Sequence, residues 1–328
     1  MAIDLIRFPI SAADGPLAEV WLDDGVVALV PAADVSPKAF RDDVPDEFYT
    51  ALHRIADRLA PSLRRRFFEA VDAMQSQIDV SAFLNAMRAG LIDQAMAAIP
   101  LDHFAERFGL AEHVLRQGVQ LAGESVATEV SGLIGLEFRF DVTNPHAVTA
   151  AATRSAELVR EVTDTTRLGI RAWIERAFVE GIPPEPLARR LREIVGLTTR
   201  QTDAVEAMRA RLLDQGIDAD RVERLTAKYA EALLRQRAET IARTELMTAV
   251  HRGQQEAWRQ AQEAGHLPDA TTRRVWITTP DDRLDESCLV LEGVTTRLGE
   301  PFPGGLMHPP LHPRCRCTTA IVFVEAEA

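Results

Sequence analysis

The chain is short of cysteine and of long apolar runs, and each shortage excludes a class of protein. Its three cysteines, Cys288, Cys315 and Cys317, lie near the end of 328 residues, and an odd number does not suit a secreted disulfide framework. No apolar run approaches the roughly 20 residues that cross a bilayer. The first residues lack the basic and apolar regions of a signal peptide. We therefore expect reduced thiols, no membrane partner, and synthesis and assembly in the cytoplasm.

Positive charge is also scarce. The formal net charge is -12, from 37 basic and 49 acidic residues. Residues 1–150 contain 12 of the basic and 22 of the acidic residues. Non-specific affinity for duplex DNA comes mainly from Lys and Arg that neutralise phosphates. Bulk DNA binding is therefore disfavoured, whereas a more local contact with DNA stays open.

The apolar spacing predicts a mainly α-helical chain with a small C-terminal α+β module. Residues 1–45 form an N-terminal segment with a hairpin across 17–22 and 26–30. Residues 46–143 and 144–235 are expected to form two helical domains. Residues 236–328 form the α+β module, whose closing part is rich in His and Cys.

Within the module, strands are predicted at 274–277 and 318–324, where β-branched and apolar residues gather. A helix is expected to start at 279–282 and to stop at Gly293. Residues 301–313 hold five prolines and two glycines, which predicts an irregular loop. Trp276 and Trp258 are expected in the core, and His251 and His266 are expected to be exposed.

Several short motifs of the second half occur in a recognisable order. They are IARTE at 241–245, a strand Trp, Asp-Arg at 282–283, a Cys before LEG at 291–293, and PPLHPRCRC at 309–317. In this order and spacing they resemble the phage head morphogenesis family, the Mu F-like minor head proteins, over about residues 144–317. The residues that carry this structural motif are Arg243, Glu245, Trp276, Asp282, Arg283, Gly293, Pro310 and Arg316.

The resemblance implies a non-enzymatic minor capsid protein of a tailed phage, carried in few copies. It implies an association with the portal protein, and with scaffold or major capsid protein as further partners. The expected location is the capsid interior or portal vertex of the virion, with a role in head morphogenesis and in DNA packaging or ejection. Residues 1–140 match no motif of the family.

The cysteines and a histidine also suggest a metal site. His312, Cys315 and Cys317 lie within six residues, and Cys288 precedes them. Zinc favours four Cys or His ligands in a tetrahedron, so our hypothesis is a structural zinc on these four, with His308 or Asp285 as substitutes. Some family members have a second cysteine at the position of Asp285. Because this chain has Asp there, a metal site made of four cysteines is excluded. Alternatively, the cysteines are small buried residues and His312 bonds a carboxylate.

Glu245 shares a helix face with apolar residues, so we expect it to be buried, with Arg314, Arg316 or His312 as its partner. Two other function classes stay open. One is a zinc-dependent hydrolase or a Cys-based transferase built on the module. The other is an ejection factor that contacts DNA. An enzyme would need a convergent acid, base and nucleophile, whereas the polar residues here fall mostly into one loop.

Overall fold

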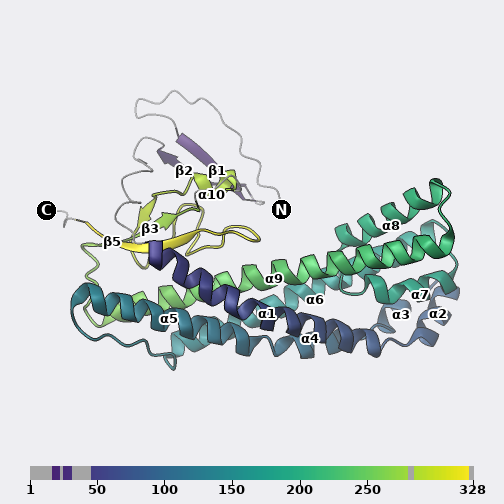
Figure 1. Ribbon diagram of the computed structural model, residues 1–328, viewed down its shortest axis with the longest axis horizontal. Coiled ribbons are helices and arrows are strands. Elements are labelled where there is room, and N and C mark those ends of the chain that lie inside the picture. Colours follow the sequence, from purple (N-terminus) through teal and green to yellow (C-terminus); the bar gives the residue numbers. More distant parts are fainter. Residues whose placement is uncertain (1–16, 23–24, 32–45, 280–283, 325–328) are drawn as a thin grey trace. The chain divides into compact units, whose positions relative to one another are not determined.

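The computed structural model describes residues 17–22, 25–31, 46–279 and 284–324, and these are mainly helical (Figure 1). The predicted fold class, mainly α with a small C-terminal α+β module, is confirmed. The helices are α1 Asp46–Ser76, α2 Val80–Arg88, α3 Ile92–Ala97, α4 Leu101–Gly109, α5 Glu112–Ile134, α6 Pro145–Val179, α7 Pro184–Ile194, α8 Thr199–Asp214, α9 Ala219–Glu263 and α10 Glu286–Leu289. The strands are β1 Leu17–Leu22, β2 Gly25–Pro31, β3 Thr272–Ile277, β4 Thr295–Thr296 and β5 Thr318–Phe323.

The chain divides into two compact units that interleave along the sequence. Unit 1 comprises Met1–Ala60, Leu115–Ala151 and Arg243–Ala328, and unit 2 comprises Pro61–Val114 and Ala152–Ala242. Four long helices, α1, α5, α6 and α9, contribute residues to both units. These units differ from the four consecutive segments expected from the sequence. The expected boundary at 235 falls inside α9, which contains no proline and a single glycine, Gly253, and so has no strong break.

Unit 2 has an interior that contains aromatic rings and the buried arginine Arg237. Phe67 packs edge-on against Phe104 and Phe108, with ring centroids 5.9 Å apart in both pairs. Arg237 is 7% exposed and donates to neutral oxygens, among them Thr166 Oγ1 at 3.0 Å and the carbonyl of Gly196. Burial lowers the pKa of Arg237 to about 10, so the guanidinium stays charged at neutral pH.

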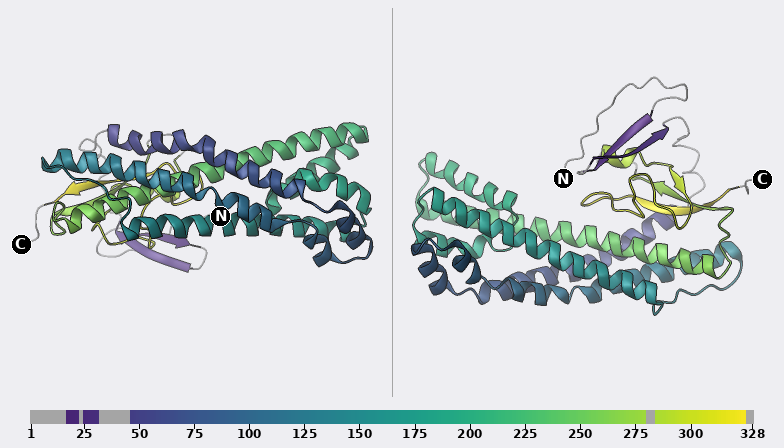
Figure 2. Two further views of the ribbon diagram at one scale, coloured as in Figure 1. Left: turned by 90° about the horizontal axis from the view of Figure 1, so that it is seen from below. Right: turned by 180° about the vertical axis from the view of Figure 1, so that it is seen from behind.

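Close helix packing in unit 1 depends on two glycines. A Cβ on Gly253 of α9 would lie 2.2 Å from the carbonyl oxygen of Val119, and one on Gly118 of α5 would lie 3.3 Å from the Cβ of Ala249. The end of α9 and α5 therefore approach at backbone distance, and Figure 2 shows them side by side. Any side chain at Gly253 would force the two helices apart.

The sheet of unit 1 has the strand order β4-β3-β5, with antiparallel pairing throughout. β3 lies in the middle, and its register joins Trp276 to Thr319 and Thr272 to Phe323. Both strands predicted for the module are therefore confirmed. Trp276 and Trp258 are 0% and 1% exposed, which confirms them as core residues.

The helix expected from 279 to Gly293 is much shorter than predicted. Residues 280–283, which include the expected start, lie outside the described part. The described helix α10 has only four residues, and Asp285 caps it by accepting from the backbone N–H of Ser287. It ends before Gly293, whose φ of 74° and N–H bond to the Trp276 carbonyl at 2.9 Å place it in a turn that contacts β3. The turn therefore stops the helix early.

The predicted N-terminal hairpin is confirmed, since β1 pairs antiparallel with β2. The Asp23-Asp24 turn between the strands lies outside the described residues. None of the helices in the described ranges combines the length and the apolar composition that a membrane crossing requires.

Glu129 of α5 makes the stability of unit 1 depend on pH. Burial raises its pKa from 4.5 to about 8, so the folded state holds a proton that the unfolded state releases above pH 4.5. The stabilising contribution is thus present below pH 4.5 and is lost as the pH rises to 8. We predict that Glu129→Gln raises the free energy of unfolding at pH 8 by roughly 3 kcal/mol relative to the native chain.

Urea unfolding at pH 5 and pH 8 measures this change. Glu124→Gln, at an exposed position of the same helix, serves as the control and should leave the pH dependence unaltered. Equal pH dependence in the native chain and in Glu129→Gln would refute the prediction.

Candidate metal centre

The candidate site lies in a long irregular segment that joins β4 to β5. Between Arg297 and Cys317 the described chain contains no helix or strand, only an isolated bridge between Phe302 and Leu306. The predicted irregular loop at 301–313 is confirmed. Because buried backbone groups need partners, side chains from other elements must supply them here.

Arg274 supplies several of these partners. It lies in β3 and is 0% exposed. Its guanidinium donates to the carbonyls of Arg297 at 3.3 Å, of Glu300 and of Met307 at 2.5 Å, and to Gln255 Oε1 at 2.6 Å. Burial lowers its pKa to about 10, which keeps the charge at neutral pH. One side chain thus fixes the first half of the loop.

His251 and Gln254 of α9 fix the end of the loop. His251 Nε2 lies 3.1 Å from the carbonyl of Cys317, and Gln254 Nε2 donates to the carbonyl of Thr319 at 2.8 Å. His251 is 0% exposed, so the expectation that it is exposed is wrong. Burial lowers its pKa to about 3, which makes the ring neutral. The spacing of His251, Gln254 and the buried Trp258 along one face of α9 was the available signal.

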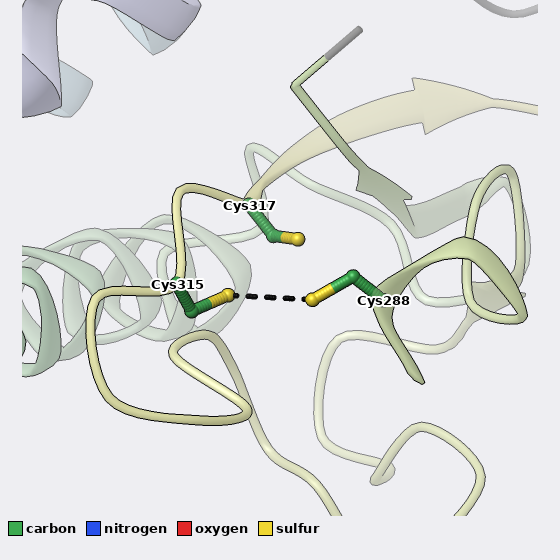
Figure 3. Close-up of side chains that lie close together, drawn as sticks. All are labelled: Cys288, Cys315 and Cys317. Carbon is green, nitrogen blue, oxygen red and sulfur yellow. Dashed lines mark hydrogen bonds between the residues drawn. The ribbon is translucent and has the colours of Figure 1, made fainter. Parts of the chain in front are cut away.

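The three cysteines come together in the interior of unit 1 (Figure 3). Their sulfur atoms all lie within 4.8 Å of one another, and the side chains are 1–3% exposed. Cys288 comes from α10 and Cys315 and Cys317 from the end of the loop, with 3.7 Å between the sulfurs of Cys288 and Cys315. Hydrogen bonds from the other two thiols lower the pKa of Cys315, and bonds among the thiols raise the pKa of Cys288 and Cys317.

His312 approaches the same cluster. Its Nε2 lies 3.1 Å from the sulfur of Cys288, and its Nδ1 lies 3.0 Å from the carbonyl of Pro313. A tight turn follows, in which the Cys315 N–H donates to the His312 carbonyl at 3.0 Å. Arg314 within this turn has φ 63°, a conformation that costs about 1 kcal/mol for a residue with a side chain. Its N–H donates to Thr244 Oγ1 on α9 at 3.0 Å, which stabilises the turn.

A pocket of about 580 Å³ lies beside the cluster. Polar residues from α1, α9, the cap of α10 and the loop before β5 line it, together with Cys315: His53, Asp57, Arg243, Asp285, His312, Arg314 and Arg316. Arg243 pairs with Asp57 at 3.3 Å. Burial lowers the pKa of His53. The wall of the pocket is therefore formed in part by two of the predicted metal ligands, His312 and Cys315.

The other described residues of the sequence motif contribute to the fold. Glu245 is 5% exposed on α9, as expected, and the carbonyl of Arg316 accepts from Thr279 Oγ1 at 2.9 Å. Pro310 follows a cis peptide bond from Pro309. Asp282 and Arg283 lie outside the described residues. Arg274 was also missed, because a lone Arg on a strand gives no distinct signal.

The comparisons agree with the resemblance seen in the motifs. Residues 169–320 match the model of the family described as Phage Mu protein F like protein, which confirms the resemblance over the second half of the chain. The match includes part of α6, all of α7 to α9, and the module up to β5. No curated protein and no solved structure matches this chain.

Arg274 should contribute strongly to the stability of the module. Replacement by Met keeps the aliphatic stem but leaves carbonyls of the loop without donors, and such unpaired groups cost roughly 1–3 kcal/mol each. We predict that Arg274→Met lowers the free energy of unfolding by at least about 3 kcal/mol. Arg273→Met, one residue earlier at a half-buried position, is the matched control, and thermal unfolding compares the two. Similar losses in both variants would contradict the assigned role of Arg274.

Glu245 should also be structural. Because a buried carboxylate leaves its surroundings unsatisfied when it is removed, we predict that Glu245→Ala destabilises unit 1 by about 2 kcal/mol, and that the isosteric Glu245→Gln loses less. Melting followed by circular dichroism tests this. An unchanged midpoint for Glu245→Ala would exclude the structural role.

Proposed function

We propose that this chain is a minor head protein of a tailed bacteriophage that acts at the portal vertex during head assembly. The observation that carries the proposal is the family match over residues 169–320. It covers the helical region and the module together, so the proposal rests on more than the short His/Cys motif. Portal association and low copy number are what the resemblance implies.

Two features of the chain support a structural role. The polar residues of the module are mostly engaged in holding its own backbone, as Arg274 and Gln254 do. The net charge of -12 disfavours general DNA binding, so the proposed partners are proteins: the portal first, and scaffold or major capsid protein second. Interiors built around satisfied polar groups give a rigid shape, which suits a subunit that must fit an assembly.

An enzyme is the second candidate, and one observation favours it. The pocket beside the cluster brings Cys315, His312 and two carboxylates to one wall, as a Cys-based transferase or a zinc hydrolase would need. Against it, Cys315 is only 3% exposed, and a reactive cysteine needs solvent access. Alkylation of the native protein with iodoacetamide separates these roles. We expect slow modification of all three thiols, and rapid labelling of Cys315 alone would favour the enzyme.

The proposed function predicts where the protein is found. In heads purified from infected cells, we expect the chain at far fewer copies than the major capsid protein. We also expect it to cross-link to the portal protein with a carboxylate-directed reagent, which suits a chain with 49 acidic residues and only two lysines. Quantitative mass spectrometry of the heads measures both.

Complementation gives the matched control. A phage that lacks the gene should form infectious heads again when Arg273→Met is supplied. It should form far fewer infectious heads when the destabilised Arg274→Met is supplied. Absence of the protein from purified heads, or a copy number near that of the major capsid protein, would overturn the proposal.

A further inference from the structure

Three buried cysteines converge in the interior of unit 1, and the half-buried His312 approaches one of them, Cys288. We propose that Cys288, His312, Cys315 and Cys317 bind one zinc ion, which joins α10 to the closing loop. The inference goes beyond the proposed function and does not rest on it, because it follows from the positions of these side chains alone.

The distances fit a tetrahedral site. Zinc bonds of about 2.3 Å to sulfur and about 2.0 Å to nitrogen place two sulfurs about 3.8 Å apart, and a sulfur and a nitrogen about 3.5 Å apart. The sulfurs of Cys288 and Cys315 are 3.7 Å apart, and Cys288 Sγ and His312 Nε2 are 3.1 Å apart. All three sulfurs lie within 4.8 Å of one another. Small side-chain rotations are therefore enough to place the three sulfurs around one ion, whereas His312 Nε2, which is not within 4.8 Å of all three, must turn further to join them.

His312 is oriented as a ligand. A carbonyl oxygen can only accept, so the contact of Nδ1 with the Pro313 carbonyl at 3.0 Å requires the proton on Nδ1. The lone pair of Nε2 then faces the sulfur of Cys288. Histidine ligands of zinc characteristically donate their other ring nitrogen to a backbone carbonyl or carboxylate in this way.

The charge around the site also suits a metal. Zinc with three thiolates and a neutral histidine carries a net charge of -1. The adjoining pocket is lined by Arg243, Arg314 and Arg316 against two carboxylates, Asp57 and Asp285. The surrounding charge is thus of the opposite sign to that of the loaded site.

The two substitute ligands considered from the sequence are engaged elsewhere. The carboxylate of Asp285 accepts from the N–H and hydroxyl of Ser287 as the cap of α10. The ring of His308 stacks on His251, with centroids 6.4 Å apart, whereas Nε2 of His312 lies 3.1 Å from Cys288 Sγ. His312 is therefore the better fourth ligand.

The local fold gives the metal a structural purpose. His312, Cys315 and Cys317 belong to a segment without regular secondary structure, and Arg314 between them has a strained backbone. Cross-linking such a segment to α10 restricts the unfolded chain and holds the turn. Because all four ligands are protein side chains, the site is closed and structural, as in zinc sites that keep no open position.

The test uses the full-length protein, purified under reducing conditions without chelator. We expect about one zinc per chain by elemental analysis. Cobalt loaded in place of zinc should give the intense visible bands of a tetrahedral thiolate site. Removal of the metal with a mercurial reagent and a chelator should release one zinc per chain and lower the melting temperature.

Variants distinguish the ligands from their neighbours. His312→Asn should weaken zinc binding at least tenfold and shift the cobalt spectrum, whereas His308→Asn, four residues earlier in the same loop, should keep one zinc per chain. A folded protein that takes up well under one zinc per chain when zinc is supplied would overturn the proposal. So would a Cys288–Cys315 disulfide under reducing conditions, or His312→Asn with unaltered affinity and spectrum. None of these outcomes depends on whether the protein is found in heads.

Discussion

The described part of unit 1 depends on hydrogen bonds to the backbone of the irregular segment between β4 and β5. Strands and helices pair their own N–H and C=O groups, and a buried loop cannot. Here the carbonyls are met by side chains from neighbouring elements: Arg274 from β3 reaches three of them, and His251 and Gln254 from α9 reach two more. The sheet, α9 and the loop are thereby tied into one structure.

The same principle explains two buried arginines that face neutral oxygens. Arg237 in unit 2 and Arg274 in unit 1 are each surrounded by carbonyl and hydroxyl acceptors. A guanidinium offers five donors in a fixed fork, and it loses less hydration on burial than an ammonium would. The chain has only two lysines among its 37 basic residues. Within the described residues, arginine therefore serves as an internal hydrogen-bond donor as well as a surface charge.

Local patterns in the sequence predicted the individual helices and strands better than the way these elements divide into compact units. The hairpin, β3, β5 and the irregular loop were all found from alternation, β-branched residues and proline content. The expected boundary at 235 falls inside α9, which runs without a break from Ala219 to Glu263, and interleaved units leave no mark in composition. The zinc site stays a prediction, made from residue type and proximity in sequence, and the structure brings its three cysteines together. The roles of His251, Gln254 and Arg274 were not predicted, because they arise from contacts between residues far apart in the chain.

The module and the helical region share one family match, and the module is the part whose chemistry can be probed directly. Hydrogen exchange on the full-length protein, with zinc bound and after its removal, tests whether side-chain anchors and metal together hold the closing loop. The account predicts that amides of residues 308–317 lose protection when the metal leaves, while those of β3 and β5 keep it. Equal protection of the loop in both states would contradict it.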